Sequence, residues 1–164
     1  MELKFQVQTK IQKPVAEVFD AVYNPDKLSG YFTNGGAKGR LDEGTTVEWA
    51  FADTPGQEIR FPVTVKQTIT DELIVLEWQS GSNGGNTRVE MKFEADGDST
   101  IVRISESGWS ETPDDLKRSY GNCMGWSQML SALKAYVEYG INLRKGAYEG
   151  LYKASDKVNK ATTD

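Results

Sequence analysis

The chain has 164 residues, a formal net charge of −5 and a hydrophobic fraction of 38%. A chain of this size typically buries roughly 70% of the surface that it exposes when unfolded, so it can form a core without disulfides or a structural metal. The acidic balance argues against a nucleic-acid partner, because phosphate backbones repel negative charge. The sequence has no histidine and one cysteine, Cys123, which excludes Ser-His-Asp and Cys-His catalysis and metal sites built on these residues. We therefore assign no catalytic residue, no metal and no cofactor.

Cysteine usage and the chain's start indicate a cytoplasmic protein. The lone Cys123 cannot form an intramolecular disulfide, which suits a reducing compartment. Residues 1–5 lack the apolar core of a signal peptide. The longest aliphatic run, residues 73–76, is far shorter than the ~20 residues that a membrane span needs.

The N-terminal part of the chain predicts one strand followed by two helices. Apolar and polar side chains alternate through residues 3–11, the pattern of a half-buried strand. Pro14 suits the first turn of a helix, and apolar residues at helical spacing continue to Val22. Asn24 and Pro25 then end this helix and begin a second, short one.

From Gly35 to Trp109 the sequence predicts strands separated by tight turns. Apolar residues alternate with polar ones, and turns rich in Gly, Asn and Asp separate several of the alternating segments. Because every connection is short, we expect one antiparallel meander. The predicted strands are residues 37–41, 45–52, 58–69, 72–80, 86–95 and 99–107.

The next segment predicts a long amphipathic helix over residues 113–144. A threonine cap, a proline and an acid three residues after the cap form a typical helix start. Apolar residues then recur at the spacing of one helix face as far as Ile141. Gly121 and Gly125 weaken the first half, so we expect a break or kink near them.

Three motifs occur in the order of a known family. They are residues 14–22 with 24–28 and Tyr31-Phe32, then Ser107-Gly108-Trp109, then Gly125-Trp126 followed by Leu130 and residues 133–138. Together they resemble the START-like (SRPBCC) superfamily, in its branch related to the activator of Hsp ATPase (AHSA-like). The resemblance spans about residues 3–143 of a predicted single domain, 1–164, and offers no pattern for the C-terminal extension, 144–164.

The resemblance implies an α+β helix-grip fold: a curved antiparallel sheet of six to seven strands wrapped around the long C-terminal helix, with a cavity between them. Members of the superfamily bind lipids, sterols, polyketides or hormones, some are cyclases or aromatase-like enzymes, and the name-giving branch assists a chaperone ATPase. We therefore expect a small hydrophobic or amphipathic ligand, with no nucleic-acid partner and no membrane span. The alternatives are a cyclase- or hydratase-type enzyme that uses a cavity carboxylate or tyrosine, and a co-chaperone-like adaptor with a protein partner or as a homodimer.

Inward-facing side chains of the strands and the long helix are the candidate lining of this cavity. Charged residues of the strands should face water, because burying unpaired charge is costly, so their apolar neighbours face the helix. The same residues could instead form an ordinary packed core, and it is the resemblance that raises the cavity interpretation. The predicted lining comprises Trp49, Phe51, Phe61, Val63, Trp78, Met91, Phe93, Glu106, Trp126, Met129, Leu130 and Leu133.

Glu106 is the charged residue of most interest. If Val102 and Ile104 point inward, the two-residue period of a strand places Glu106 inward as well. A buried carboxylate there needs a partner or takes up a proton, and we expect it to affect ligand choice rather than stability. Alternatively, the strand ends or bulges before Glu106 and the side chain is solvated. The apolar Ile101 also leaves open which set of alternating residues in this strand points inward.

Overall fold

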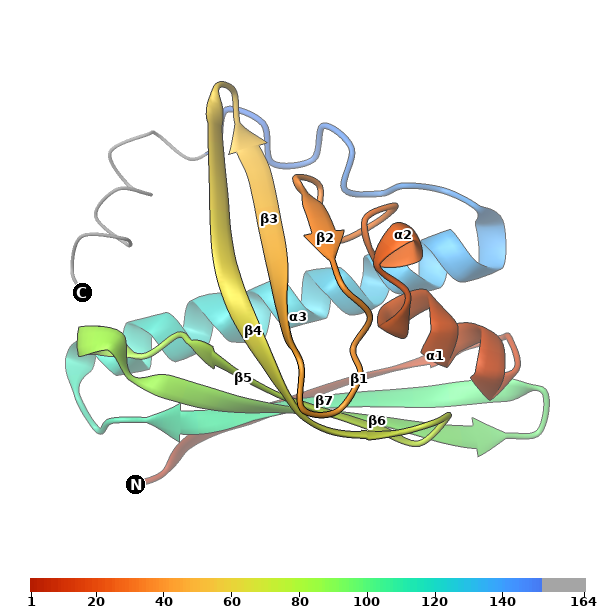
Figure 1. The fold of residues 1–164 in the computed structure, drawn as a ribbon, viewed down its shortest axis with the longest axis horizontal. Helices are drawn as coiled ribbons and strands as arrows, with labels where there is room; N and C mark the ends of the chain where they lie inside the picture. The colour runs from red at the N-terminus through yellow and green to blue at the C-terminus, as the bar shows by residue number, and fades with distance from the viewer. Residues whose placement is uncertain (152–164) are drawn as a thin grey trace.

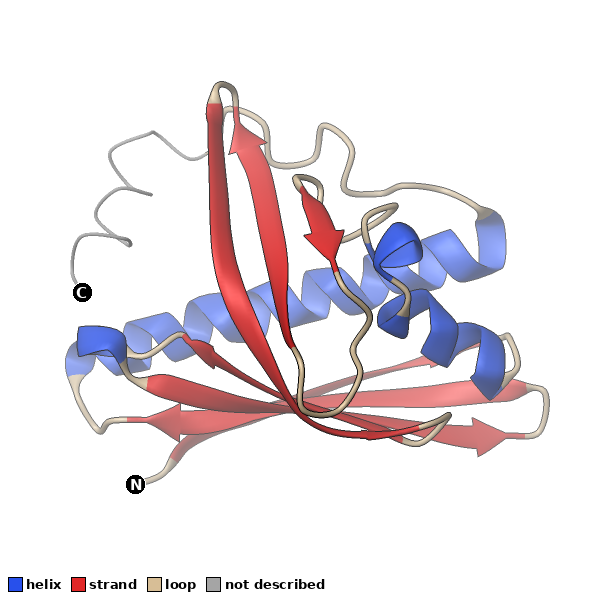
Figure 2. Ribbon diagram, in the orientation of Figure 1, coloured by secondary structure: helices blue, strands red, loops and turns tan. Residues whose placement is uncertain are grey.

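The structure, a computed structural model, describes residues 1–151, which form a curved seven-stranded antiparallel sheet, a long helix and two short helices (Figures 1 and 2). The strand order is β1-β7-β6-β5-β4-β3-β2, so β2 to β7 form the predicted meander and β1 pairs with β7. In chain order the elements are β1 (Leu3–Ile11), α1 (Val15–Tyr23), α2 (Pro25–Leu28), β2 (Gly36–Lys38), β3 (Thr46–Thr54), β4 (Gln57–Ile69), β5 (Leu73–Gln79), a 3-10 turn (Ser82–Gly84), β6 (Asn86–Asp96), β7 (Ser99–Trp109) and α3 (Pro113–Tyr139). The predicted helix-grip fold is confirmed.

The predicted starts of α2 and α3 are confirmed by their hydrogen bonds. Asn24 Oδ1 accepts from the backbone N–H of Asp26 at 3.0 Å, which caps α2. At α3, Thr112 Oγ1 accepts from the N–H of Asp115 at 3.2 Å. These local interactions satisfy backbone donors that the first turn of a helix leaves without a partner.

Two expectations about α3 are wrong. The helix ends at Tyr139 instead of residue 144, because Gly140 adopts a left-handed conformation with φ of 67° and its N–H bonds to the carbonyl of Tyr136. Ile141 therefore lies outside the helix and is 52% exposed. The expected break is also missing, since α3 runs through Gly121 and Gly125 without interruption.

The first strand of the meander is shorter than predicted. It covers Gly36–Lys38 instead of residues 37–41. The backbone of Leu41 leaves the sheet, because its N–H donates to the carbonyl of Tyr23 and its carbonyl accepts from the Thr68 hydroxyl at 2.6 Å. Leu41 is thus tied to the end of α1 and to β4.

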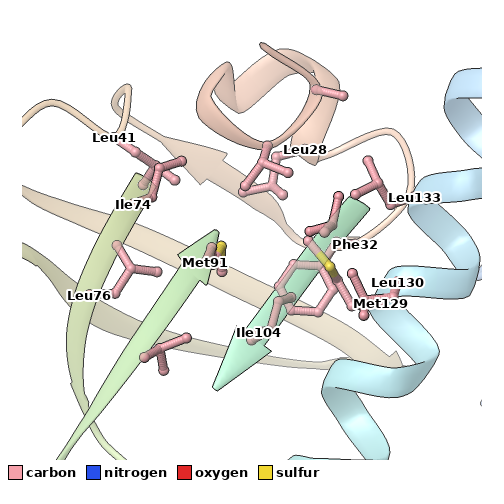
Figure 3. Packing of buried hydrophobic residues seen from close by; sticks show 14 of the residues in the cluster. Leu28, Phe32, Leu41, Ile74, Leu76, Met91, Ile104, Met129, Leu130 and Leu133 are labelled. Atoms are coloured by element: carbon pink, nitrogen blue, oxygen red, sulfur yellow. The ribbon is translucent and has the colours of Figure 1, made fainter. Parts of the chain in front are cut away.

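The core lies between the inner face of the sheet and α3. Figure 1 shows α3 lying across the concave side of the sheet, while α1 and α2 close one end. Leucine, isoleucine and methionine side chains fill this space together with Phe32, as Figure 3 shows for Leu28, Leu41, Ile74, Leu76, Met91, Ile104, Met129, Leu130 and Leu133. This packing fills the end of the helix–sheet interface that lies toward α1.

The segment after α3, residues 140–151, turns back along the molecule toward the hairpin turn that joins β3 to β4 (Figure 1). Arg144 anchors it there, because its Nη2 donates to Asp53 Oδ2 at 2.9 Å. The remainder of the predicted extension, 152–164, lies outside the described residues. Within residues 1–151, no helix is both long and apolar enough to cross a membrane.

Candidate functional site

A cavity of about 360 Å³ lies between the β3–β5 part of the sheet, the N-terminal half of α3 and the segment 140–151. Aromatic residues dominate its walls, and two glycines of α3 contribute no side chain. Its lining consists of Phe32, Phe51, Asp53, Ile59, Phe61, Trp78, Gly121, Asn122, Met124, Gly125, Trp126, Gln128, Arg144 and Tyr148. A space of this size falls in the range typical of small-molecule sites.

Five of the lining rings contact one another in a closed circuit, which we call the aromatic ring wall: Phe32, Trp126, Trp78, Phe61 and Phe51. Going round this circuit, neighbouring ring centroids are 5.5, 5.5, 5.4, 5.7 and 5.1 Å apart. Aromatic contacts at such distances typically add about 0.5–1.5 kcal/mol each beyond the burial of area. The wall is therefore held by its own ring contacts and presents apolar surface to the cavity.

Behind this wall lies Glu106, which is 1% exposed. Of the two alternatives for this residue, the structure shows the inward one: β7 alternates regularly, and Glu106 shares its inner face with Val102 and Ile104. Its neighbours across the sheet are Phe5 of β1 and Val89 of β6. Strand periodicity thus places a carboxylate in an apolar interior.

Four neutral donors surround the Glu106 carboxylate. Trp78 Nε1 and Thr87 Oγ1 donate to Oε1 at 2.8 and 2.7 Å, and Trp126 Nε1 donates to Oε2 at 2.8 Å. Asn122 Nδ2 lies 3.0 and 3.2 Å from the two oxygens and also contacts Ser80 Oγ. A carboxylate offers about four lone-pair positions, so protein groups saturate it.

The environment of Glu106 has opposing effects on its charge. Burial raises the pKa of the carboxyl above its ordinary value of 4.5, and the hydrogen bonds from Thr87, Trp78, Trp126 and Asn122 offset only part of this increase. None of these four donors is a titratable acid or base. Glu106 therefore holds the two indole rings of the wall in place through their N–H groups.

Gly121 and Gly125 lie one turn apart on α3, where the helix faces the cavity. A Cβ built at either position meets no atom within 4 Å. Glycine inside a helix is less favourable than alanine by roughly 1 kcal/mol, and here it leaves the cavity open. The two residues that predicted a kink instead form part of the cavity lining.

At another side of the cavity, Arg144 and Asp53 form an ion pair with little exposure, 13% and 10% for the two side chains. Asn34 Nδ2 also donates to Asp53, at 2.8 Å. The Arg144 guanidinium carbon lies 5.0 Å from the ring centres of both Phe51 and Tyr148. Such distances fit cation–π contacts, so the pair is attached to the aromatic ring wall.

The predicted lining residues fall into three groups. Phe51, Phe61, Trp78 and Trp126 line the cavity. Glu106 lies behind the indoles, and Trp49 packs against Trp78 at 5.9 Å. The remaining residues belong to the packed core and not to the cavity lining: Val63, Met91, Phe93, Met129, Leu130 and Leu133.

Sequence reasoning did not select Phe32, Asn122, Arg144 or Tyr148 for the site. Asn122 had a usable signal, because it precedes Trp126 by one helical turn and so shares its face. Arg144 and Tyr148 follow the end of α3 and carried no periodic signal. Among the described residues, no group of three or more His, Cys, Asp or Glu could hold a metal ion.

The curved sheet that grips a C-terminal helix, with a cavity between the two, defines this protein as a member of the START-like (SRPBCC) class. Residues 12–138 match the family described as "Activator of Hsp90 ATPase homolog 1-like protein", and the chain belongs to this family. A comparison with curated proteins gives no match.

Solved structures with the same fold come from several bacteria. SSP2350 from Staphylococcus saprophyticus is 25% identical, with a TM-score of 0.66 over 85% of this chain and 96% of that one. The Aha1 dimer from Colwellia psychrerythraea is 24% identical, with a TM-score of 0.65 over 84% and 97%. DynU16, from the dynemicin biosynthetic locus, is 19% identical with a TM-score of 0.72, and the match covers 85% of this chain but about half, 49%, of DynU16.

Proposed function

We propose that this protein binds a small apolar or amphipathic molecule in the cavity between the sheet and α3. The observation that carries the proposal is a space of about 360 Å³ bounded by the aromatic ring wall, with two helix glycines that leave it unfilled. Pockets that bind small molecules are typically apolar with a few placed polar groups, and here those groups are Asn122, Gln128 and the Asp53–Arg144 pair. We place this binding in the cytoplasm, because the lone Cys123 suits a reducing compartment.

The chemistry around Glu106 favours binding over acid–base catalysis. An enzyme of the cyclase or hydratase type needs a carboxyl that can exchange a proton with the substrate. Glu106 instead lies behind Trp78 and Trp126, and its oxygens are saturated by neutral donors. The indole rings therefore line the cavity, while the carboxylate lies behind them.

An unfilled cavity also favours binding over a purely adaptor-like role, for which a fully packed interior would suffice. A homodimer is compatible with ligand binding. The relative from Colwellia psychrerythraea is a dimer in its solution structure, and light scattering coupled to size-exclusion chromatography tests this state for the present chain.

The proposal is tested by thermal shift with fatty acids, sterols, flavonoids and aromatic polyketides, combined with native mass spectrometry of the purified protein. A ligand present at a hundred times its Kd stabilises the folded state by about 2.7 kcal/mol. For a chain of this size each kcal/mol moves Tm by roughly 2–4 °C. We therefore expect an increase in Tm on the order of 5–10 °C for a matching ligand.

A cavity-filling variant provides the matched comparison. In Gly125→Leu the new side chain leans toward the helix N-terminus, over Gly121, and occupies the open space. This variant should gain helix propensity, keep its fold and lose the ligand-induced shift. Ser127→Leu, at an exposed position of the same helix, should retain the shift. If Gly125→Leu responds to ligands like the parent chain, binding takes place elsewhere and the proposal fails.

A further inference from the structure

We propose that the ligand carries an oxyanion, a carboxylate or a sulfonate on an apolar aromatic body, and that Arg144 receives it. This inference deepens the proposed function and rests on it. It assigns a role to residues 140–151, which lie beyond the residues that match the family, 12–138.

Of the charged groups at the cavity, Arg144 is the one with hydrogen-bond donors to spare, whereas the two carboxylates already accept from neighbouring side chains. The Glu106 carboxylate already accepts from four side chains. The Asp53 carboxylate accepts from Asn34 and from Arg144. A guanidinium has five N–H donors, and the hydrogen bond from Nη2 to Asp53 uses one of them. Within the described residues, the buried Nε of Arg144 has no hydrogen-bond partner.

The guanidinium has more N–H donors than the one that bonds to Asp53. A ligand acceptor that reaches these donors forms a charge-assisted hydrogen bond, a strong type that Arg makes in pairs with carboxylates and similar groups. The guanidinium therefore lacks an acceptor, whereas a donor on the ligand would find both carboxylates occupied.

The position of the guanidinium also matches a ligand with an aromatic body. Arg144 lies over Phe51 and Tyr148 at 5.0 Å, and over Phe32 at 6.0 Å. These contacts and the bond to Asp53 restrict its conformation before any ligand arrives, which reduces the entropy lost on binding. An oxyanion at Arg144 leaves the apolar part of the same molecule against Phe51 and its neighbours in the aromatic ring wall.

Two fluorescent probes that share one skeleton test the inference. N-phenyl-1-naphthylamine is neutral, and 1-anilinonaphthalene-8-sulfonate carries the same rings with a sulfonate. Their Kd values are measured by fluorescence titration of the full chain, and the Tm of each complex verifies that binding is to the folded state. We expect the sulfonate to bind the parent chain more tightly by about tenfold or more, the factor that a charge-assisted hydrogen bond supplies.

Two variants at the ion pair should act in opposite directions. Asp53→Asn keeps the acceptor oxygen for Asn34 and frees Arg144 from its counter-ion, so it should tighten the sulfonate probe several-fold relative to the neutral probe. Asp53→Asn with Arg144→Gln replaces the ion pair by two amides and should remove the preference for the sulfonate. The ratio of the two Kd values is the readout in both variants, because a change in the cavity itself affects both probes and a change at Arg144 affects the sulfonate.

The outcomes separate the two proposals. If the neutral probe binds and the sulfonate has no advantage, or keeps its advantage in the double variant, the inference about Arg144 is overturned while cavity binding stands. If neither probe binds or shifts Tm, the cavity proposal itself fails, and the inference fails with it. Opposite changes of the Kd ratio in the two variants would support the role of Arg144.

Discussion

Replacing Glu106 by glutamine tests whether the carboxylate holds the aromatic ring wall. Glutamine has nearly the same shape, but one of its two acceptor oxygens becomes an NH₂ group. With its oxygen in the place of Oε1, the new amide faces Trp126 Nε1, which lies 2.8 Å from Oε2 in the parent chain. An indole N–H can only donate, so it cannot adapt, whereas Asn122 can rotate its amide and accept.

The expected cost follows from this one lost interaction. A buried donor without a partner costs about 1–3 kcal/mol, and the removal of a buried charge with a raised pKa returns part of it. We expect Glu106→Gln to lower the free energy of unfolding by about 1–2 kcal/mol. This differs from the expectation drawn from the sequence, that Glu106 affects ligand choice and not stability.

A double-mutant cycle with Trp126→Phe isolates the interaction. Phenylalanine has no N–H, so Glu106→Gln should cost less in the Trp126→Phe background by about 1 kcal/mol or more. Urea denaturation followed by circular dichroism measures all four proteins. Additivity within about 0.5 kcal/mol would refute the reasoning, since it would show that the carboxylate and the indole do not depend on each other.

Three further predictions concern stability. Trp126→Ala should lower the unfolding free energy by about 3–5 kcal/mol in urea denaturation, because it removes a buried ring that contacts three others. Tyr31→Phe should cost about 1 kcal/mol, since the buried hydroxyl donates to the carbonyl of Ala21 at 3.0 Å. Burial raises the pKa of Asp115, but the hydrogen bonds from two backbone N–H groups lower it by more than burial raises it. The pKa in the folded state therefore lies below the ordinary 3.8. The stabilisation is then present above pH 3.8 and is lost as pH falls below it, so Asp115→Asn should cost less at pH 3 than at pH 7 in denaturant titrations.

The fold was predictable because its signals are local. Strand alternation, the caps at Asn24 and Thr112 and the short turns each constrain a few neighbouring residues, and all of them agree. The end of α3 was missed for a similarly local reason. Apolar residues continue at helical spacing as far as Ile141, but Gly140 in its left-handed conformation ends the helix before Ile141.

Alternation also placed Glu106 on the inner face of β7, but it could not separate cavity from core. Phe61 and Val63 face the same side of β4 in sequence, yet Phe61 lines the cavity and Val63 is packed. Gly121 and Gly125 of α3 line the cavity together with Phe61, whereas Val63 belongs to the packed cluster that contains the large α3 residues Met129, Leu130 and Leu133. The two-residue alternation of a strand tells which side chains face inward from the sheet, whereas a cavity depends on how the sheet and the helix together fill the space between them.

The Asp53–Arg144 pair shows where sequence patterns stop. Its two members are 91 residues apart, and neither belongs to a periodic segment that would bring them together. The pair forms because Gly140 ends α3 early and lets the following residues return to the end of β3. A longer helix, as the apolar spacing predicted, would carry Arg144 away from Asp53 and leave the cavity without Tyr148. The left-handed glycine thus decides which charges reach the site, and with them the kind of ligand that the aromatic ring wall can be expected to hold.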